Sequence, residues 1–350
     1  MAYELNHSDE AAADAEAAEK QMKQQIKRNE DLMNRRRTVK RMIDILLCAV
    51  LLAAVCYSAV GIYVYNASVH SVNQERRPLS CKQESLEKKG FDVTGFETKY
   101  HRQTVMIPSS FGDYKIPAYY FSPDGARERD TVVLAHGLNG NRLTGYPVAE
   151  MFLRHGYNVM TYDQRASGES EAEYMTCGYW ESRDFADCVD YVRENAGEDR
   201  RIGAWGSSFG GATVGFYLGT KDAQQLSFAV LDCPVSDMAE IIDCFLTRKN
   251  DWIPAALRIS AGSTVTKLKL GYDYTDGNVC DYVADTTVPV LIFHTKKDRV
   301  TPYHMGTDLY EAMHANRKKE ISIEDSGHTD IYFDHPEFYE KEMFRFISGE

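Results

Sequence analysis

One serine of this chain stands in a context that suggests chemistry. The pentapeptide Gly206-Ser207-Ser208-Phe209-Gly210 follows a strand-like run that begins at Arg201, and it precedes a run of small residues typical of a helix start. Glycines on both sides let the backbone turn sharply and leave the Ser208 hydroxyl exposed at the start of that helix. The pattern predicts a nucleophilic serine, although a glycine-rich turn without chemistry has the same appearance.

A serine hydroxyl is too weak an acid to attack a carbonyl group unaided at neutral pH, so it needs a base within hydrogen-bond reach. Two candidate partners follow in chain order. Asp298 comes after an apolar, strand-like run that begins at Val288, and His328 comes after a second run that begins at Glu320. Because the carboxyl ends of parallel strands share one edge of a sheet, we expect Ser208, Asp298 and His328 to meet there.

The expected roles follow from the residue types. His328 would accept the serine proton and later return it to the leaving group, and Asp298 would hold the imidazole in the useful tautomer. Asp325 lies in the same loop as His328 and is an alternative acid. His335 precedes Pro336 and is expected to cap the last helix.

Hydrolysis through a tetrahedral intermediate also needs N–H donors for the developing negative oxygen. The run 131–135 reads as a buried strand, and it leads directly into the loop His136-Gly137-Leu138-Asn139-Gly140-Asn141. The backbone N–H groups of Leu138 and Phe209 are the expected oxyanion-hole pair. A simple glycine turn is the alternative for this loop.

Five segments together resemble the α/β-hydrolase superfamily over about residues 104–350, most closely its serine-aminopeptidase-like and monoacylglycerol-lipase-like branch. They are HGLNGN at 136–141, DQRASGES at 163–170, GSSFG at 206–210, HTKKDRVTP at 294–302 and DSGH at 325–328. The resemblance implies an α/β fold with a mostly parallel eight-stranded sheet flanked by helices. It also implies Ser208 as nucleophile, Asp298 as acid and His328 as base. One departure is Ala166, which stands where the family pattern has glycine.

An insert at about 237–287 separates two of the expected strands and is not needed by the sheet. Apolar residues recur in it at helical spacing, which indicates a helix with one apolar face. The insert is either a helix packed on the core or a small lid over Ser208. As a lid, it would use Trp252 and Leu257 to bind substrate.

The run Ile45 to Tyr65 holds no charged residue over 21 positions, which is long enough to cross a hydrocarbon core of about 30 Å. It predicts a transmembrane helix, with a cleaved signal peptide as the less favoured alternative. Basic residues crowd its N-terminal side, so the positive-inside rule keeps the N-terminus cytoplasmic and the hydrolase domain extracytoplasmic, at the cell membrane. The expected parts are a charged helical tail at 1–41, a membrane helix at 42–66, a linker at 67–95 and the hydrolase domain at 96–350.

The net charge of −12 argues against nonspecific nucleic-acid binding. No phosphate-cradling loop, placed dinucleotide fingerprint or metal-ligand spacing is found in the sequence, so neither a cofactor nor a metal is expected. Six of the eight cysteines lie beyond the apolar run, and the sequence leaves open whether they pair or remain buried thiols.

The sequence therefore predicts a membrane-anchored serine hydrolase that cleaves carboxylic esters through an acyl-enzyme. A serine peptidase of the same fold, acting on peptides rather than on small acyl esters, is the close alternative. A non-catalytic, membrane-anchored binding module is the alternative of another class, because folds of this type host many functions.

Overall fold

The computed structural model describes residues 2–70, 78–248 and 252–350. They form two compact units, Met1–Ala59 and Val60–Glu350. The first unit lies within the helix α1 (Ala2–Tyr65). By length and composition, the later part of this helix could cross a membrane. Its apolar side chains are exposed, as Leu51 and Leu52, each 65% exposed, illustrate.

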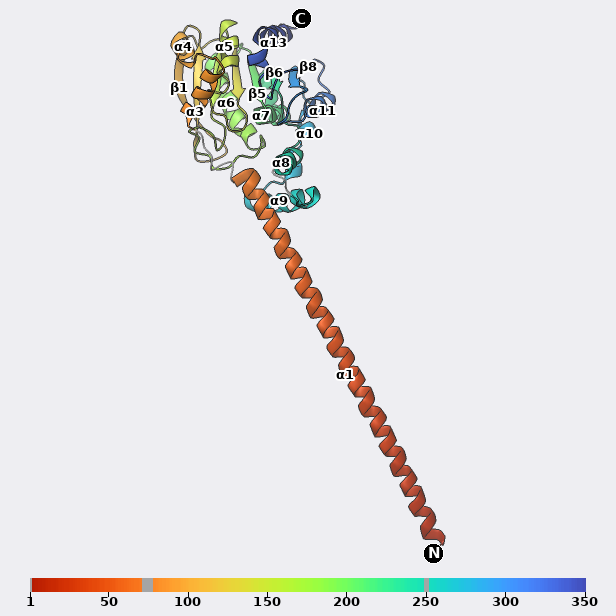
Figure 1. The fold of residues 1–350 in the computed structure, drawn as a ribbon. Coiled ribbons are helices and arrows are strands. Elements are labelled where there is room, and N and C mark those ends of the chain that lie inside the picture. The colour runs from red at the N-terminus through yellow and green to blue at the C-terminus, as the bar shows by residue number, and fades with distance from the viewer. Residues whose placement is uncertain (1, 71–77, 249–251) are drawn as a thin grey trace. The chain divides into compact units, whose positions relative to one another are not determined.

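The second unit alternates strands and helices (Figure 1). Its strands are β1 (His101–Pro108), β2 (Lys115–Ser122), β3 (Thr131–Ala135), β4 (Asn158–Tyr162), β5 (Ile202–Ser207), β6 (Leu226–Asp232), β7 (Val290–Thr295) and β8 (Lys318–Ile323). Its α-helices are α3 (Leu79–Lys88), α4 (Val93–Lys99), α5 (Tyr146–Arg154), α6 (Glu181–Ala196), α7 (Phe209–Leu218), α8 (Met238–Thr247), α9 (Ala255–Leu270), α10 (Val279–Val283), α11 (His304–Ala312), α12 (Ile331–Asp334) and α13 (Pro336–Ser348). Shorter helical turns are η1 (Asn66–His70), η2 (Lys221–Gln225) and η3 (Tyr274–Gly277).

The eight strands form one sheet in the order β1-β2-β4-β3-β5-β6-β7-β8. The pairs β1–β2 and β2–β4 are antiparallel, and all pairs from β4 to β8 are parallel. This arrangement confirms the predicted fold class, a mostly parallel eight-stranded sheet flanked by helices. The strand expected at 131–135 has the predicted ends, whereas the strands expected to begin at Arg201, Val288 and Glu320 begin one or two residues away from those positions.

Both faces of the central strands are buried, which explains their nearly continuous apolar sequences. Along β6 and β7, successive side chains belong alternately to two hydrophobic clusters, as expected from the period of two in a strand. Ala229 and Ile292 face the cluster that includes α6, α7, α10 and α11, whereas Phe228 and Phe293 face the cluster that includes α5 and α13. Helices therefore cover the sheet from both sides and fix the position of every loop at its edges.

The predicted insert forms α8, α9, η3 and α10, and α8 carries the expected apolar face. Arg258 on α9 is only 4% exposed and forms an ion pair with Asp243 on α8 at 2.5 Å. Ion pairs and apolar contacts thus join α8 and α9 into one substructure, which we call the cap.

The last turn of α1, which lies in the second unit, packs against α9. Val64 is fully buried, and a Cβ atom added at Gly262 would lie 2.4 Å from Val64 Cγ1. A Cβ atom added at Gly61 would lie 2.5 Å from the carbonyl oxygen of Ala261. The two glycines therefore permit a close approach that larger residues would prevent.

We expect Gly262→Val to destabilise the cap, because overpacking of a close contact typically costs about 1–3 kcal/mol. Thermal unfolding of the full chain in detergent should show a lower Tm, by roughly 2–4 °C for each kcal/mol lost. Leu268→Ala is the control, since Leu268 lies on the same helix and is 81% exposed. An unchanged Tm together with unchanged hydrogen exchange in α9 would contradict this packing.

Candidate active site

Ser208 occupies the sharp turn between β5 and α7. Its φ is +56°, a left-handed value that a non-glycine residue adopts rarely and at a cost of about 1–3 kcal/mol. Its N–H donates to the carbonyl oxygen of Asp232 at 2.8 Å, which fastens the turn to the end of β6. Side chains at the flanking glycines would collide with backbone: a Cβ at Gly206 would lie 2.2 Å from Gly210 O, and one at Gly210 would lie 2.0 Å from Ala135 O. The glycines are therefore required by packing.

The loop after β3 passes directly beside Ser208. A Cβ atom at Gly137 would lie 3.0 Å from Ser208 Cβ and 3.6 Å from Ser208 Oγ. The backbone N–H groups of Leu138 and Phe209 donate to no acceptor within the described part of the chain. For Phe209 this is expected, since the first N–H groups of a helix have no intrahelical partner. Two unoccupied donors thus lie in the loop and the helix start that border the hydroxyl.

A buried side-chain network that was not predicted from the sequence fixes this loop. Gln164 N–H donates to His136 Nε2 at 3.1 Å, so the proton of the neutral ring sits on Nδ1, which donates to Gly137 O at 2.8 Å. Burial lowers the pKa of His136 to about 4, so the ring is neutral at pH 7. The Gln164 amide also donates to His136 O and accepts from Thr213 Oγ1 at 2.8 Å. The loop is therefore tied to α7, the helix that begins beside Ser208.

Asp298 and His328 are hydrogen-bonded partners. His328 Nδ1 lies 2.7 Å from Asp298 Oδ2, and the Asp298 side chain is fully buried. A proton on Nδ1 donates to the carboxylate, which leaves Nε2 as the ring's acceptor. The His328 side chain is 17% exposed, so the ring is accessible from solvent.

The Asp298 carboxylate is surrounded by donors. Oδ1 accepts from the N–H of Val300 at 2.7 Å and of Thr301 at 2.9 Å, and Oδ2 also accepts from Thr301 Oγ1 at 2.9 Å. His294 Nε2 lies 3.5 Å from Oδ2. Burial by itself raises the pKa of this carboxyl, but these donors and the His328 ring lower it well below its ordinary value. Asp298 is therefore ionised over the whole physiological range.

Asp325 does not contact the His328 ring among the described interactions. Its Oδ1 instead lies 2.9 Å from His335 Nε2. His335 occupies the N-cap position of α13, as expected, but its side chain caps no backbone N–H group there. In the described geometry Asp298, not Asp325, is the carboxylate bonded to His328.

Ser208 follows β5, on one side of the C-terminal end of β6. The Asp298–His328 pair follows β7 and β8, on the other side. Ser207 pairs in register with Asp232, and Cys233 Sγ lies within 4.8 Å of ligand atoms of both Asp298 and His328. No hydrogen bond joins Ser208 Oγ to the His328 ring in the described residues, although such bonds often tighten only when substrate is bound. The same trio of Cys233, Asp298 and His328 has the spacing of a metal site, but burial raises the pKa of the Cys233 thiol and disfavours the thiolate that a metal needs.

Two other features of the DQRASGES loop are structural. The buried Asp163 carboxylate pairs with the Arg142 guanidinium and accepts from the Arg142 N–H at 2.7 Å. Ala166 has a φ of +53°, so the family's glycine at this place reflects a left-handed backbone, which the alanine adopts with strain.

The two residues predicted to bind substrate are exposed to solvent. Trp252 is 89% exposed and Leu257 is 37% exposed, and neither lines a described hollow. A hollow lined by Gly137, Leu138 and Phe209 has a cavity volume of only about 10 Å³. A cleft lined by Asp298 and His328 has a cavity volume of about 690 Å³.

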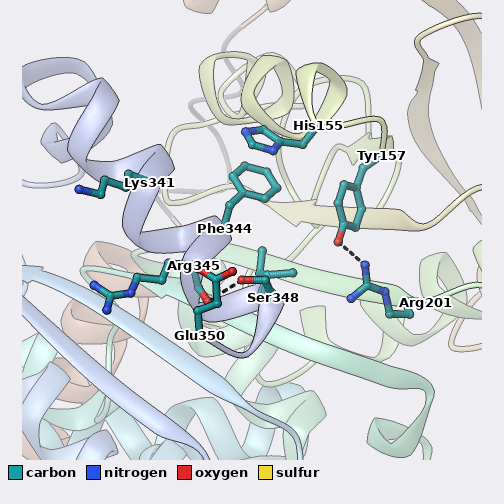
Figure 2. A pocket seen from close by; sticks show the side chains of 9 residues that line it. His155, Tyr157, Arg201, Lys341, Phe344, Arg345, Ser348 and Glu350 are labelled. Carbon is teal, nitrogen blue, oxygen red and sulfur yellow. Dashed lines mark hydrogen bonds between the residues drawn. The ribbon is translucent and has the colours of Figure 1, made fainter.

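A further hollow of about 570 Å³ lies at the opposite edge of the sheet (Figure 2). Tyr157 and Arg201, which line it and bond to each other at 2.9 Å, directly precede β4 and β5. Ser208 follows the other end of β5. Because β5 has six residues, that end lies about 20 Å from Arg201. This hollow is separate from the candidate site.

The chain is similar to several known proteins. The family described as alpha/beta hydrolase fold matches residues 130–253. The uncharacterized protein YqkD of Bacillus subtilis is 25% identical over 260 residues, which cover 74% of this chain and 84% of YqkD. The uncharacterized protein YfhR of Salmonella typhimurium is 25% identical over 324 residues, which cover 90% of this chain and 97% of YfhR.

The solved structure of the esterase Pf2001 of Pyrococcus furiosus resembles this chain with a TM-score of 0.59 and 21% identity. The match covers 74% of this chain and 94% of the esterase. A similarity at this identity shows the shared fold. Together with the observed sheet, these comparisons show that the chain has the α/β-hydrolase fold.

Proposed function

We propose that this protein is a membrane-anchored serine hydrolase that cleaves carboxylic esters. Ser208 is the nucleophile, His328 the general base and Asp298 the acid that orients the base. The observation that carries the proposal is the bond between His328 Nδ1 and the buried Asp298 carboxylate at 2.7 Å, at the sheet edge where Ser208 stands.

The acylation step follows from these groups. His328 Nε2 accepts the Ser208 proton while Oγ bonds to the ester carbonyl carbon, and the carbonyl oxygen gains the negative charge. The free N–H groups of Leu138 and Phe209 stabilise that oxygen, where each donor is typically worth about 10²–10³ in rate. The imidazolium then gives its proton to the departing alcohol, and the acyl group remains on Ser208.

Deacylation repeats these steps with water. His328 Nε2 takes a proton from a water molecule, the hydroxide attacks the acyl-enzyme, and the carboxylic acid leaves as Ser208 recovers its proton. The Asp298 charge stabilises the imidazolium in both half-reactions. The similarity in fold to the esterase Pf2001 supports an ester as substrate, and a peptide is the alternative.

The long apolar stretch of α1 supports the proposed anchor, with the N-terminus cytoplasmic and the hydrolase domain extracytoplasmic. The parts proposed from the sequence are the tail at 1–41, the membrane helix at 42–66, the linker at 67–95 and the hydrolase domain at 96–350.

The nucleophile can be tested with a fluorophosphonate probe, which reacts with activated serines. We expect the full chain to be labelled and the Ser208→Ala variant to lose the labelling, because the probe reacts with the hydroxyl that His328 activates in the proposed mechanism. Ser207→Ala is the matched control, since the neighbouring serine ends β5 and should be dispensable for labelling. Labelling that persists in Ser208→Ala would exclude this mechanism.

The acid can be tested by comparing two carboxylates of neighbouring loops. We expect Asp298→Asn to keep the fold and to lower kcat by about 10⁴-fold, because an amide at this place stabilises the wrong histidine tautomer. Asp325→Asn should lower kcat far less, since Asp325 binds His335. Circular dichroism checks folding, and turnover of a chromogenic ester gives kcat. Near-normal turnover of Asp298→Asn combined with loss in Asp325→Asn would make Asp325 the acid.

The anchor can be tested with a chain tagged at both ends. We expect both tags to remain in the membrane fraction after an alkaline carbonate wash, because a spanning helix resists extraction. The C-terminal tag should be accessible to protease from outside the cell, and the N-terminal tag should not. Loss of the N-terminal tag from the mature protein would instead indicate a cleaved signal sequence.

A further inference from the structure

The cleft beside His328 lies on the leaving-group side of the proposed reaction centre. It has a cavity volume of about 690 Å³ and is lined by 296–300, after β7, and 325–328, after β8. His328, which lines it, is the residue that gives its proton to the departing alcohol in the proposed mechanism. The small hollow on the oxyanion side, lined by Leu138 and Phe209, shares no residue with this cleft.

The cleft has two cationic side chains that are not bonded to another described residue. Its three cationic side chains are Lys296, Lys297 and Arg299, all exposed. Lys296 is neutralised by Glu324, at 2.5 Å. Lys297 and Arg299 have no ion-pair or hydrogen-bond partner for their side chains among the described residues.

The two carboxylates that line the cleft are both hydrogen-bonded to histidines. Asp325 is bound to His335 at 2.9 Å, and the Asp298 side chain is fully buried and committed to His328. Lys297 and Arg299 therefore remain the cationic side chains of the cleft that are available to a ligand.

A second observation concerns the floor of the cleft. Ser326 lines the cleft, is only 1% exposed, and its hydroxyl has no hydrogen-bond partner in the part of the chain that the structure describes. Buried hydroxyl groups are usually satisfied, so this one needs an ordered water molecule or a bound ligand as its partner. A hydroxyl donates to phosphate and carboxylate oxygens alike.

We propose that this cleft binds an anionic group, a phosphate or a carboxylate, on the alcohol part of the ester substrate. Lys297 and Arg299 attract the anion, and Arg299 can hold two of its oxygens at once through its planar guanidinium. The ester carbonyl then lies at Ser208 with the alcohol oxygen near His328. This inference rests on the proposed esterase function and narrows it to acyl esters of anionic alcohols.

The test uses three esters of one acyl group: one with a phosphate on the alcohol, one with a carboxylate, and a neutral one with a hydroxyl in its place. We expect the full chain in detergent to give a higher kcat/KM for an anionic ester than for the neutral one. The double variant Lys297→Ala/Arg299→Ala should lower that ratio about tenfold, and high salt should lower it in the wild type, because exposed charges are screened. Lys221→Ala, an exposed lysine on η2, is the control and should keep the ratio.

Comparison of the phosphate and carboxylate esters identifies the preferred anion. A wild-type ratio near one, or an unchanged ratio in the double variant, overturns the proposal. A direct binding measurement separates failure of the anion site from failure of the esterase function. In it, calorimetry follows binding of the phosphate-bearing alcohol to the Ser208→Ala chain. Binding that the double variant loses supports the anion site even if no ester is cleaved, and absence of binding together with active hydrolysis of the neutral ester refutes only the anion site.

Discussion

A buried negative charge organises the candidate site. The Asp298 carboxylate has been removed from water, and it remains ionised because two backbone N–H groups, the Thr301 hydroxyl and two histidine rings surround it. Removing an ion from water is costly unless donors replace its hydration, so the loop after β7 must hold this shape whether or not substrate is present. The orientation of His328, and with it the availability of Nε2, follows from that loop.

The second constraint is one of space around Ser208. The turn needs a left-handed serine, and it needs glycines because Ala135 O and Gly210 O occupy the positions of the missing Cβ atoms. Strain of this kind persists only where the surroundings enforce it. Here the β6 backbone accepts the Ser208 N–H, and the His136–Gln164–Thr213 network ties the adjacent loop to α7. The turn at Ser208 is thus held by backbone bonds, and the adjacent loop is held by buried side chains.

Much of this arrangement could be predicted from the sequence, because each predicted element had a local signal. Apolar runs such as 131–135 and the one that begins at Val288 identified buried strands, and residues that directly follow parallel strands must gather at one edge. The contacts made across the fold had no such signal. The approach of His294 to Asp298, the pairing of Asp325 with His335 and the role of Gln164 depend on which side chains meet after folding. Exposure of Trp252 likewise depends on how the cap packs, which hydropathy does not specify.

The end of the apolar run in α1 illustrates the same limit. Hydropathy measures how strongly a side chain avoids water, but not which apolar medium receives it. The Val64 side chain is completely buried against α9, whereas Leu51 and Leu52 are each 65% exposed. Exposed apolar surface of this extent is typical of an interaction site, and a bilayer would cover it if α1 is the proposed anchor. α9 is bound to α8 through Arg258. The Phe245 ring of α8 in turn lies 6.3 Å from the Phe209 ring. Through α9 and α8, the last turn of α1 therefore also supports the wall of the candidate site.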